Sequence, residues 1–172
     1  MAGTPDDTLR ILRQLRQVRE YTSQPIPDDV LHDILEVGRW TGTGGNRQPT
    51  EVIVIRDLEV KKKFAEWGAR PAATGTIDLL LVSNSDEWAL DEGRMAERLM
   101  LAAAAHGLGA GLATLKNQGP AEAKKLLGIP LDKRVVAVVS LGYTDVEARK
   151  AIPKSAGPLR KPMAQYAHID RW

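Results

Sequence analysis

The chain contains no cysteine, so it can form no disulfide, zinc–thiolate site, iron–sulfur cluster or thiol nucleophile. A chain without cysteine is compatible with the cytoplasm, which is where we expect this protein to work. Aromatic residues are also scarce, because one phenylalanine stands beside four tryptophans and three tyrosines. The core must therefore be filled mainly by leucine, valine, isoleucine and alanine.

An excess of charge and a membrane-spanning run are also missing. The 24 basic and 22 acidic residues give a net charge of +2, which is too balanced to suggest a nucleic-acid surface. Residues Met1 to Arg10 include two aspartates and no apolar run, which argues against a secretory signal. The longest apolar stretch, Leu99 to Leu115, contains His106 and three glycines. It fits a buried helix, a turn and a strand better than a membrane span.

Apolar periodicity predicts helices and strands that alternate along the chain. Helices are expected at residues 6–17, 27–40, 57–67, 91–106 and 120–127, and strands at 51–56, 77–83, 111–115 and 135–141. The length and this order favour a single domain, residues 1–172, with a central sheet flanked by helices. Three prolines exclude a long helix in the tail, residues 151–172. The tail is either disordered or laid across a surface, and a terminal Trp172 favours a surface.

The segment Arg16-Gln17-Val18-Arg19-Glu20-Tyr21 carries two arginines that are three positions apart. One interpretation is structural, because cations at the end of a helix offset the helix dipole. The other is a phosphate clamp, because two guanidinium groups can donate hydrogen bonds to one phosphate. The residues alone leave both interpretations open.

A glycine-rich loop, Thr41 to Pro49, leads into the first expected strand. A flexible turn between a helix and a strand would have such a composition. However, glycine also allows the backbone to approach a flat ring closely, because it has no Cβ. The amides of Asn46 and Gln48 could then pair with the donor and acceptor edge of such a ring.

Two further segments need an interpretation. The run Gly107-Leu108-Gly109-Ala110-Gly111 follows a helix and precedes a strand, which is the reverse of the order in a dinucleotide-binding fingerprint. The C-terminus carries Arg160-Lys161-Pro162-Met163, followed by His168-Ile169-Asp170-Arg171-Trp172. These basic residues are either an ordinary charged tail or a second anion-binding pair, to which Lys154 could be added. The three histidines have no metal-ligand spacing, and no acid–base pair or catalytic triad can be argued.

In this order, the segments resemble the motifs of the nitroreductase-like family of FMN-dependent oxidoreductases. The family's first motif is R-R-S-x-R-x-F/Y, and here Leu15 stands for its first arginine and Gln17 for its serine. The loop is similar to P-S-x-x-N-x-Q-P, with Gly42 in place of the proline and Thr43 in place of the serine. The C-terminus resembles R-K-P-L…H-W-E-R-W. The resemblance covers roughly Leu9 to Trp172.

The resemblance implies an α+β nitroreductase-like fold with a central mixed sheet. It also implies an intertwined homodimer in which the C-terminal tail crosses to the partner, and two FMN sites at the interface. The implied FMN-binding residues are Arg16, Gln17, Arg19, Thr43, Gly44, Asn46, Gln48, Thr114, Leu115, Arg160 and Lys161. The basic residues would hold the phosphate, and the loop amides would address the ring edge from the second subunit. No catalytic residue is expected, because the flavin carries the hydride chemistry.

The implied reaction is a ping-pong reduction. NAD(P)H would reduce FMN and leave, and a small acceptor such as a nitroaromatic or a quinone would then be reduced. Three other hypotheses stay open: a flavin-binding carrier or sensor without turnover, an enzyme that reduces or fragments another cofactor, and a dimer without a ligand. A deazaflavin in place of FMN is also compatible with the sequence.

Overall fold

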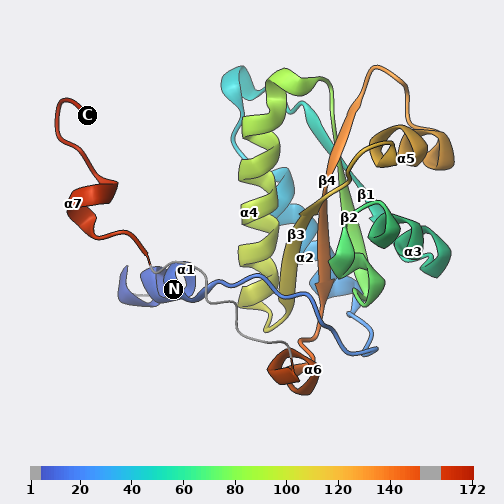
Figure 1. Cartoon of the computed structure of the whole chain (residues 1–172), viewed down its shortest axis with the longest axis horizontal. Coiled ribbons are helices and arrows are strands. Elements are labelled where there is room, and N and C mark those ends of the chain that lie inside the picture. Colours follow the sequence, from blue (N-terminus) through green and yellow to red (C-terminus); the bar gives the residue numbers. More distant parts are fainter. Residues whose placement is uncertain (1–4, 152–159) are drawn as a thin grey trace.

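Four antiparallel strands form the centre of the molecule, in the order β1-β2-β4-β3 (Figure 1). The computed structural model describes residues 5–151 and 160–172. The strands are β1 (Thr50–Ile55), β2 (Ile77–Ser83), β3 (Gly109–Thr114) and β4 (Arg134–Gly142). The expected mixed sheet is thus antiparallel in each of its three ladders. Within the described ranges, a parallel pairing occurs as the isolated bridge between Gln17 and Ala110.

Helices cover both faces of this sheet. The longer ones are α1 (Pro5–Gln14), α2 (Asp28–Arg39), α3 (Leu58–Glu66), α4 (Ala89–Ala105) and α5 (Gly119–Leu127). Two short helices, α6 (Val146–Ala151) and α7 (Met163–Tyr166), and the single 3₁₀ turns η1 (Gly44–Asn46), η2 (Arg70–Ala73) and η3 (Asp86–Trp88) complete the described elements. Helices α2 and α4 lie on one face of the sheet, and α3 and α5 lie on the other (Figure 1).

Most element boundaries follow from local chemistry. The Asp57 side chain caps α3 by accepting hydrogen bonds from the backbone N–H groups of Glu59 and Val60. Gly128 closes α5 in a left-handed conformation, with φ of 67°, which costs glycine little. The first helix is shorter than its periodicity predicts, since it ends at Gln14 rather than at residue 17. The two short helices and the 3₁₀ turns were not expected from the sequence.

The core is aliphatic and lies in two layers. On the α2 and α4 face, Leu79 and Leu81 of β2 pack in one cluster with Ile34 and Leu99. On the opposite face, Leu80 packs in a second cluster that includes the one phenylalanine, Phe64. All of β2 is buried because helices cover both of its faces.

Residues 160–172 extend away from the sheet on the side where α1 lies (Figure 1). All of these residues are exposed. The Trp172 side chain is 100% exposed, and its ring stacks on His168 with 4.4 Å between centroids. The terminal tryptophan was expected to anchor the tail on a surface, and within the described residues it does not do so on its own chain. No helix in these ranges has both the length and the apolar character needed to cross a membrane.

One carboxyl group is enclosed in this core. Asp78 of β2 is completely buried opposite Ser140 of β4, and neither of its carboxyl oxygens has a hydrogen-bond partner among the described residues. Burial raises the pKa of Asp78 to about 6, against the opposing influence of the Ser140 hydroxyl and the Lys61 ammonium group. Lys61 Nζ instead donates to the carbonyl oxygens of Gly75 (2.8 Å) and Thr76 (3.2 Å). Ionisation of Asp78 therefore destabilises the folded state.

The pKa of Asp78 predicts a pH-dependent stability. The pKa of Asp78 in the folded state lies above its ordinary value of 3.8. The stability that the protonated carboxyl group gives to the folded state is therefore complete below pH 3.8, and it is lost as the pH rises through the pKa of the folded state. Asp78→Asn removes this titration. From about pH 4.5 to about pH 7.5, the free energy of unfolding of the wild type should fall relative to this variant by roughly 2 kcal/mol. Urea denaturation across this range measures the difference. Asp132→Asn, at an exposed aspartate, is the control for the substitution itself. A difference between the wild type and Asp78→Asn that is constant with pH would contradict the assignment.

Candidate functional site

The segment Arg16 to Tyr21 does not form a helix, and its first residues lie along β3, the edge strand of the sheet. The Val18 N–H donates to the carbonyl oxygen of Ala110 (2.9 Å), and Gln17 Oε1 accepts from the N–H of Leu112 (2.7 Å). Both partners belong to β3. Because the chain is extended after α1, Arg16 and Arg19 are spaced along it by about 10 Å of backbone rather than by one helical turn.

Gly111 permits this close approach. A Cβ atom at Gly111 would stand 2.1 Å from the carbonyl oxygen of Val18, so any larger residue would push the segment off β3. This contact explains why glycine stands at position 111, within the run that superficially resembles a dinucleotide fingerprint. Tyr21 fixes the far end of the segment, because its hydroxyl donates to the carbonyl oxygen of Val18 (2.8 Å) and also approaches that of Ser140 (3.1 Å). Burial, with a smaller contribution from Asp78, raises the pKa of Tyr21 above its usual range.

Residues from the two ends of the chain line one cleft of about 520 Å³, which we name the arginine cleft. It is lined by Leu12, Arg13, Leu15, Arg16, Gln17, Glu97, Met100 and Arg160. The Arg16 guanidinium donates to the backbone carbonyl oxygens of Arg13 (2.6 Å) and Leu15 (2.8 Å). Within the described part of the chain, no carboxylate forms an ion pair with Arg13, Arg16 or Arg160. The cleft therefore concentrates positive charge that is not neutralised by ion pairing.

The other predicted cations are not part of this cleft. Arg19 is exposed, and its carbonyl oxygen accepts from Thr74 Oγ1 (3.1 Å), near the 3₁₀ turn η2. Lys161 is exposed next to Arg160 but does not line the cleft. Lys154 lies outside the described residues. The structure thus brings together Arg16, Gln17 and Arg160 of the predicted set.

The loop before β1 has an unusual backbone. Asn46 and Gln48 both have positive φ angles, 54° and 48°, and Gly45 between Gly44 and Asn46 has a φ of 60°. Thr43 maintains this shape, because its Oγ1 accepts from the N–H of Gln48 (3.0 Å) and its carbonyl oxygen accepts from the N–H of Asn46 (3.0 Å). The Thr43 hydroxyl is therefore engaged within the loop. Strained backbone at two residues predicted to bind a ligand is typical of a functional loop.

The end of β3 offers fewer free groups to a ligand than the sequence suggested. Thr114 is exposed. Leu115 is buried in the α3 and α5 layer, and its N–H donates to the carbonyl oxygen of Val136 (2.9 Å). The backbone donor of Leu115 is therefore already used within the protein.

The loop and the arginine cleft lie beside different parts of α4. Arg47 lies over the ring of Trp88, just before α4 begins, whereas the cleft reaches Glu97 and Met100 further along the helix. Neither Asn46 nor Gln48 lines the arginine cleft. One chain thus presents two separate halves of the predicted site.

Two charged residues of the cleft, Arg13 and Glu97, are not among the residues predicted from the sequence. Arg13 stands three positions before Arg16, and an i,i+3 pattern of arginines could have indicated it. Glu97 projects from a helix that is remote in sequence, and no sequence signal connects it to the arginines.

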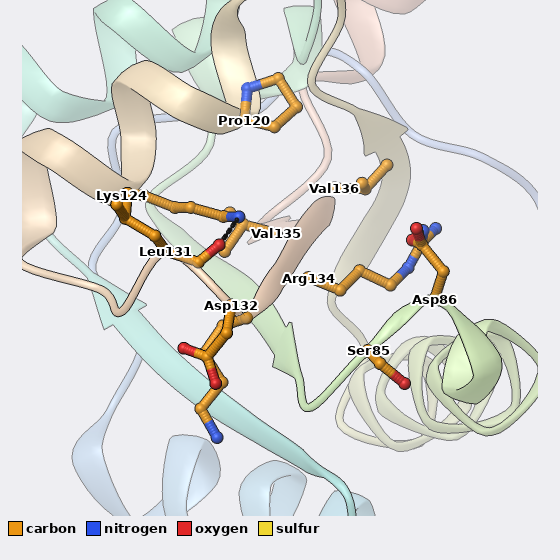
Figure 2. A pocket seen from close by; sticks show the side chains of 10 residues that line it. Ser85, Asp86, Pro120, Lys124, Leu131, Asp132, Arg134, Val135 and Val136 are labelled. Atoms are coloured by element: carbon orange, nitrogen blue, oxygen red, sulfur yellow. Dashed lines mark hydrogen bonds and ion pairs between the residues drawn. The ribbon is translucent and has the colours of Figure 1, made fainter.

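A second cleft, of about 380 Å³, lies between α5, η3 and the start of β4. Figure 2 shows that its cations point to groups of the protein itself. Lys124 Nζ donates to the carbonyl oxygen of Leu131 (2.7 Å), and Arg134 forms ion pairs with Asp86 and Glu92. Since these cations are already paired, the second cleft is a weaker candidate for an anionic ligand than the arginine cleft.

Comparison with known proteins agrees with this architecture. The family model of the nitroreductase family matches residues 12–91 and 82–143, and so covers most of the chain. An Archaeoglobus fulgidus protein, provisionally named NADH dehydrogenase/NAD(P)H nitroreductase, is 32% identical over 149 residues, which are 80% of this chain and 86% of that protein. The chain belongs to the nitroreductase family, and it is accordingly an oxidoreductase.

Comparison also finds relatives of lower sequence identity. The NADPH-flavin oxidoreductase of Vibrio harveyi is 23% identical over 160 residues, covering 81% of this chain and 67% of that protein. The solved structure of an FMN-dependent nitroreductase from Clostridium difficile R20291 superposes with a TM-score of 0.78 at 19% identity, covering 95% of this chain and 99% of that one. At this identity, the superposition establishes the α+β nitroreductase-like fold, with its sheet between two layers of helices.

Proposed function

We propose that this protein binds FMN and uses NAD(P)H to reduce a small acceptor, such as a nitroaromatic or a quinone, by a ping-pong reaction. The observation that carries this proposal is the arginine cleft, where Arg16 and Arg160 meet from the two ends of the chain. The names of relatives support it, because they include an NADPH-flavin oxidoreductase and an FMN-dependent nitroreductase.

The residues of the arginine cleft fit a flavin phosphate. A guanidinium group offers five N–H donors and no acceptor, so the cluster of Arg13, Arg16 and Arg160 matches the oxygens of a phosphate dianion. Gln17 and the loop amides of Asn46 and Gln48 would complement the donor and acceptor edge of the pyrimidine ring. Thr43 would act indirectly, by holding Gln48 in place.

A flavin supplies the hydride chemistry when it is bound, and the protein supplies binding and orientation. This division explains why the described residues need not include a nucleophile or an acid–base pair. The three arginines would hold the phosphate end, and the strained loop would orient the ring. Arg19, Gly44, Thr114, Leu115 and Lys161 belong to the proposed site by resemblance, with less support from their positions.

We propose further that the working unit is a homodimer. Within one chain the loop does not line the arginine cleft, so a complete site needs the loop of a second copy. The tail also supports a dimer, because the side chains of Ile169 and Trp172 are 85% and 100% exposed. Burying such side chains against a partner is favourable by about 1.5–3 kcal/mol each. A tail that crosses to the partner would achieve this burial.

The reductase proposal predicts a specific optical response. Protein supplied with FMN should show flavin absorption bands, and anaerobic addition of NADH or NADPH should bleach them because hydride reduces the ring. A nitroaromatic or a quinone should then restore the bands. Bands that persist with both nucleotides in excess would contradict the reductase and favour the carrier or sensor. A protein that binds no flavin would refute the cofactor.

The phosphate clamp predicts a selective loss of affinity. Arg16→Ala combined with Arg160→Ala should raise the Kd for FMN about a hundredfold or more, since each charged hydrogen bond contributes about 1.5–3 kcal/mol. The Kd for riboflavin, which lacks the phosphate, should hardly change. Fluorescence titration with both flavins measures the two constants. Arg70→Ala, at an exposed arginine on η2, is the control. Equal weakening of both flavins would show that the arginines do not hold the phosphate.

The dimer proposal predicts the effect of charge in the tail. Ile169→Asp with Trp172→Asp should shift the protein from dimer to monomer, because a carboxylate cannot be buried in an apolar interface without a large penalty. Light scattering after gel filtration measures the mass. Leu131→Asp is a matched control, because Leu131 is also 85% exposed but lies beside α5. A wild-type monomer, or an unchanged dimer in the double variant, would refute this role of the tail.

A further inference from the structure

The loop that carries Asn46 and Gln48 touches a side chain that no motif includes. The guanidinium carbon of Arg47 lies 5.8 Å from the centroid of the Trp88 ring. Trp88 ends the 3₁₀ turn η3 and stands immediately before α4. A guanidinium at this distance from an indole ring is attracted by the negative face of the ring.

The loop needs an external support because its own hydrogen bonds are local. Among the described residues, the hydrogen bonds of residues 43–48 join Thr43, Gly44, Asn46, Arg47 and Gln48 to one another. Two of these residues, Asn46 and Gln48, hold left-handed backbone angles that side chains with a Cβ disfavour. Such a conformation persists only where the surroundings enforce it. Arg47 stands between the two strained residues, so a contact that fixes Arg47 acts on both.

We propose that Trp88 is a positioning residue for the flavin-binding loop, and that it acts by holding Arg47 against its ring. In this arrangement Asn46 and Gln48 keep their left-handed conformation before the cofactor arrives. This inference rests on the proposed function for its effect on flavin, but not for its effect on the loop itself. Trp88 would not contact the flavin, and its contribution would be pre-organisation of the loop.

The first test uses the full-length protein without flavin. Amide hydrogen exchange of Asn46, Arg47 and Gln48 measures how often the loop opens, because all three N–H groups are bonded within it. Trp88→Leu should accelerate this exchange about two- to fivefold, which is the change expected from loss of an exposed cation–π contact. Trp88→Phe keeps an aromatic face and should recover part of the protection.

Trp40→Leu is the matched control. Trp40 precedes the loop in the sequence and, like Trp88, lies under an arginine, with 5.6 Å from the Arg39 guanidinium carbon to the centroid of its ring. Its Nε1, however, donates to Glu36 on α2. Its loss should leave the exchange of the loop amides unchanged. A double variant provides a second control. Because Trp88 acts through Arg47, Trp88→Leu with Arg47→Ala should accelerate exchange no more than either change alone.

The second test measures FMN affinity in the same variants. Trp88→Leu should raise the Kd for FMN by a smaller factor than it accelerates exchange, because affinity follows the closed fraction of the loop whereas exchange follows its open fraction. Trp88→Phe should be intermediate and Trp40→Leu unchanged. Unchanged exchange in a folded Trp88→Leu protein would overturn the inference, as would additive effects in the double variant. A change in Kd without a change in exchange would mean that Trp88 contacts the ligand, which also overturns it. If the wild type binds no FMN, the proposed function fails, and the exchange experiment still decides the role of Trp88.

Discussion

The close contact between the N-terminal segment and β3 is the constraint on which the rest of the site depends. The segment can lie on the sheet because Gly111 leaves room for the carbonyl oxygen of Val18. Hydrogen bonds from Val18 and to Gln17 then fix its register against β3. This register places Arg16 beside α4, where Arg160 completes the cleft. A larger residue at position 111 would displace the whole segment, although it would touch no ligand.

Much of the fold could be predicted from residue patterns. The strand expected at 77–83 and the helices expected at 57–67 and 120–127 are confirmed, and local chemistry at Asp57 and Gly128 explains where those helices begin and end. The early end of α1 was missed because apolar spacing continues past Gln14, while the backbone is already bound to β3. The resemblance implied a mixed sheet, whereas the three ladders between the four described strands are antiparallel. Strand pairing is set by tertiary packing that a residue pattern does not contain.

In the candidate site, too, some residues could be found from local sequence patterns, and others depend on tertiary contacts. Asn46 and Gln48 were found by motif, and their strained backbone is consistent with a functional role. Glu97 and Trp88 could not be found in this way, because their importance comes from contacts between distant segments, whereas the spacing of Arg13 to Arg16 could have indicated Arg13. The separation of the loop from the arginine cleft was expected only through the resemblance, which assigned the loop to a second subunit. That assignment remains a prediction.

The tryptophans have a practical consequence. Trp67 lies 6.1 Å from Phe64 in the α3 and α5 layer, whereas Trp88 adjoins the loop and Trp172 ends the tail. Because the chain has only four tryptophans, each can be changed singly and the loss of emission assigned to one location. Flavins absorb light where indoles emit. The protein thus carries built-in optical probes, from which distances between a bound flavin, the loop and the tail could be measured without attaching a dye.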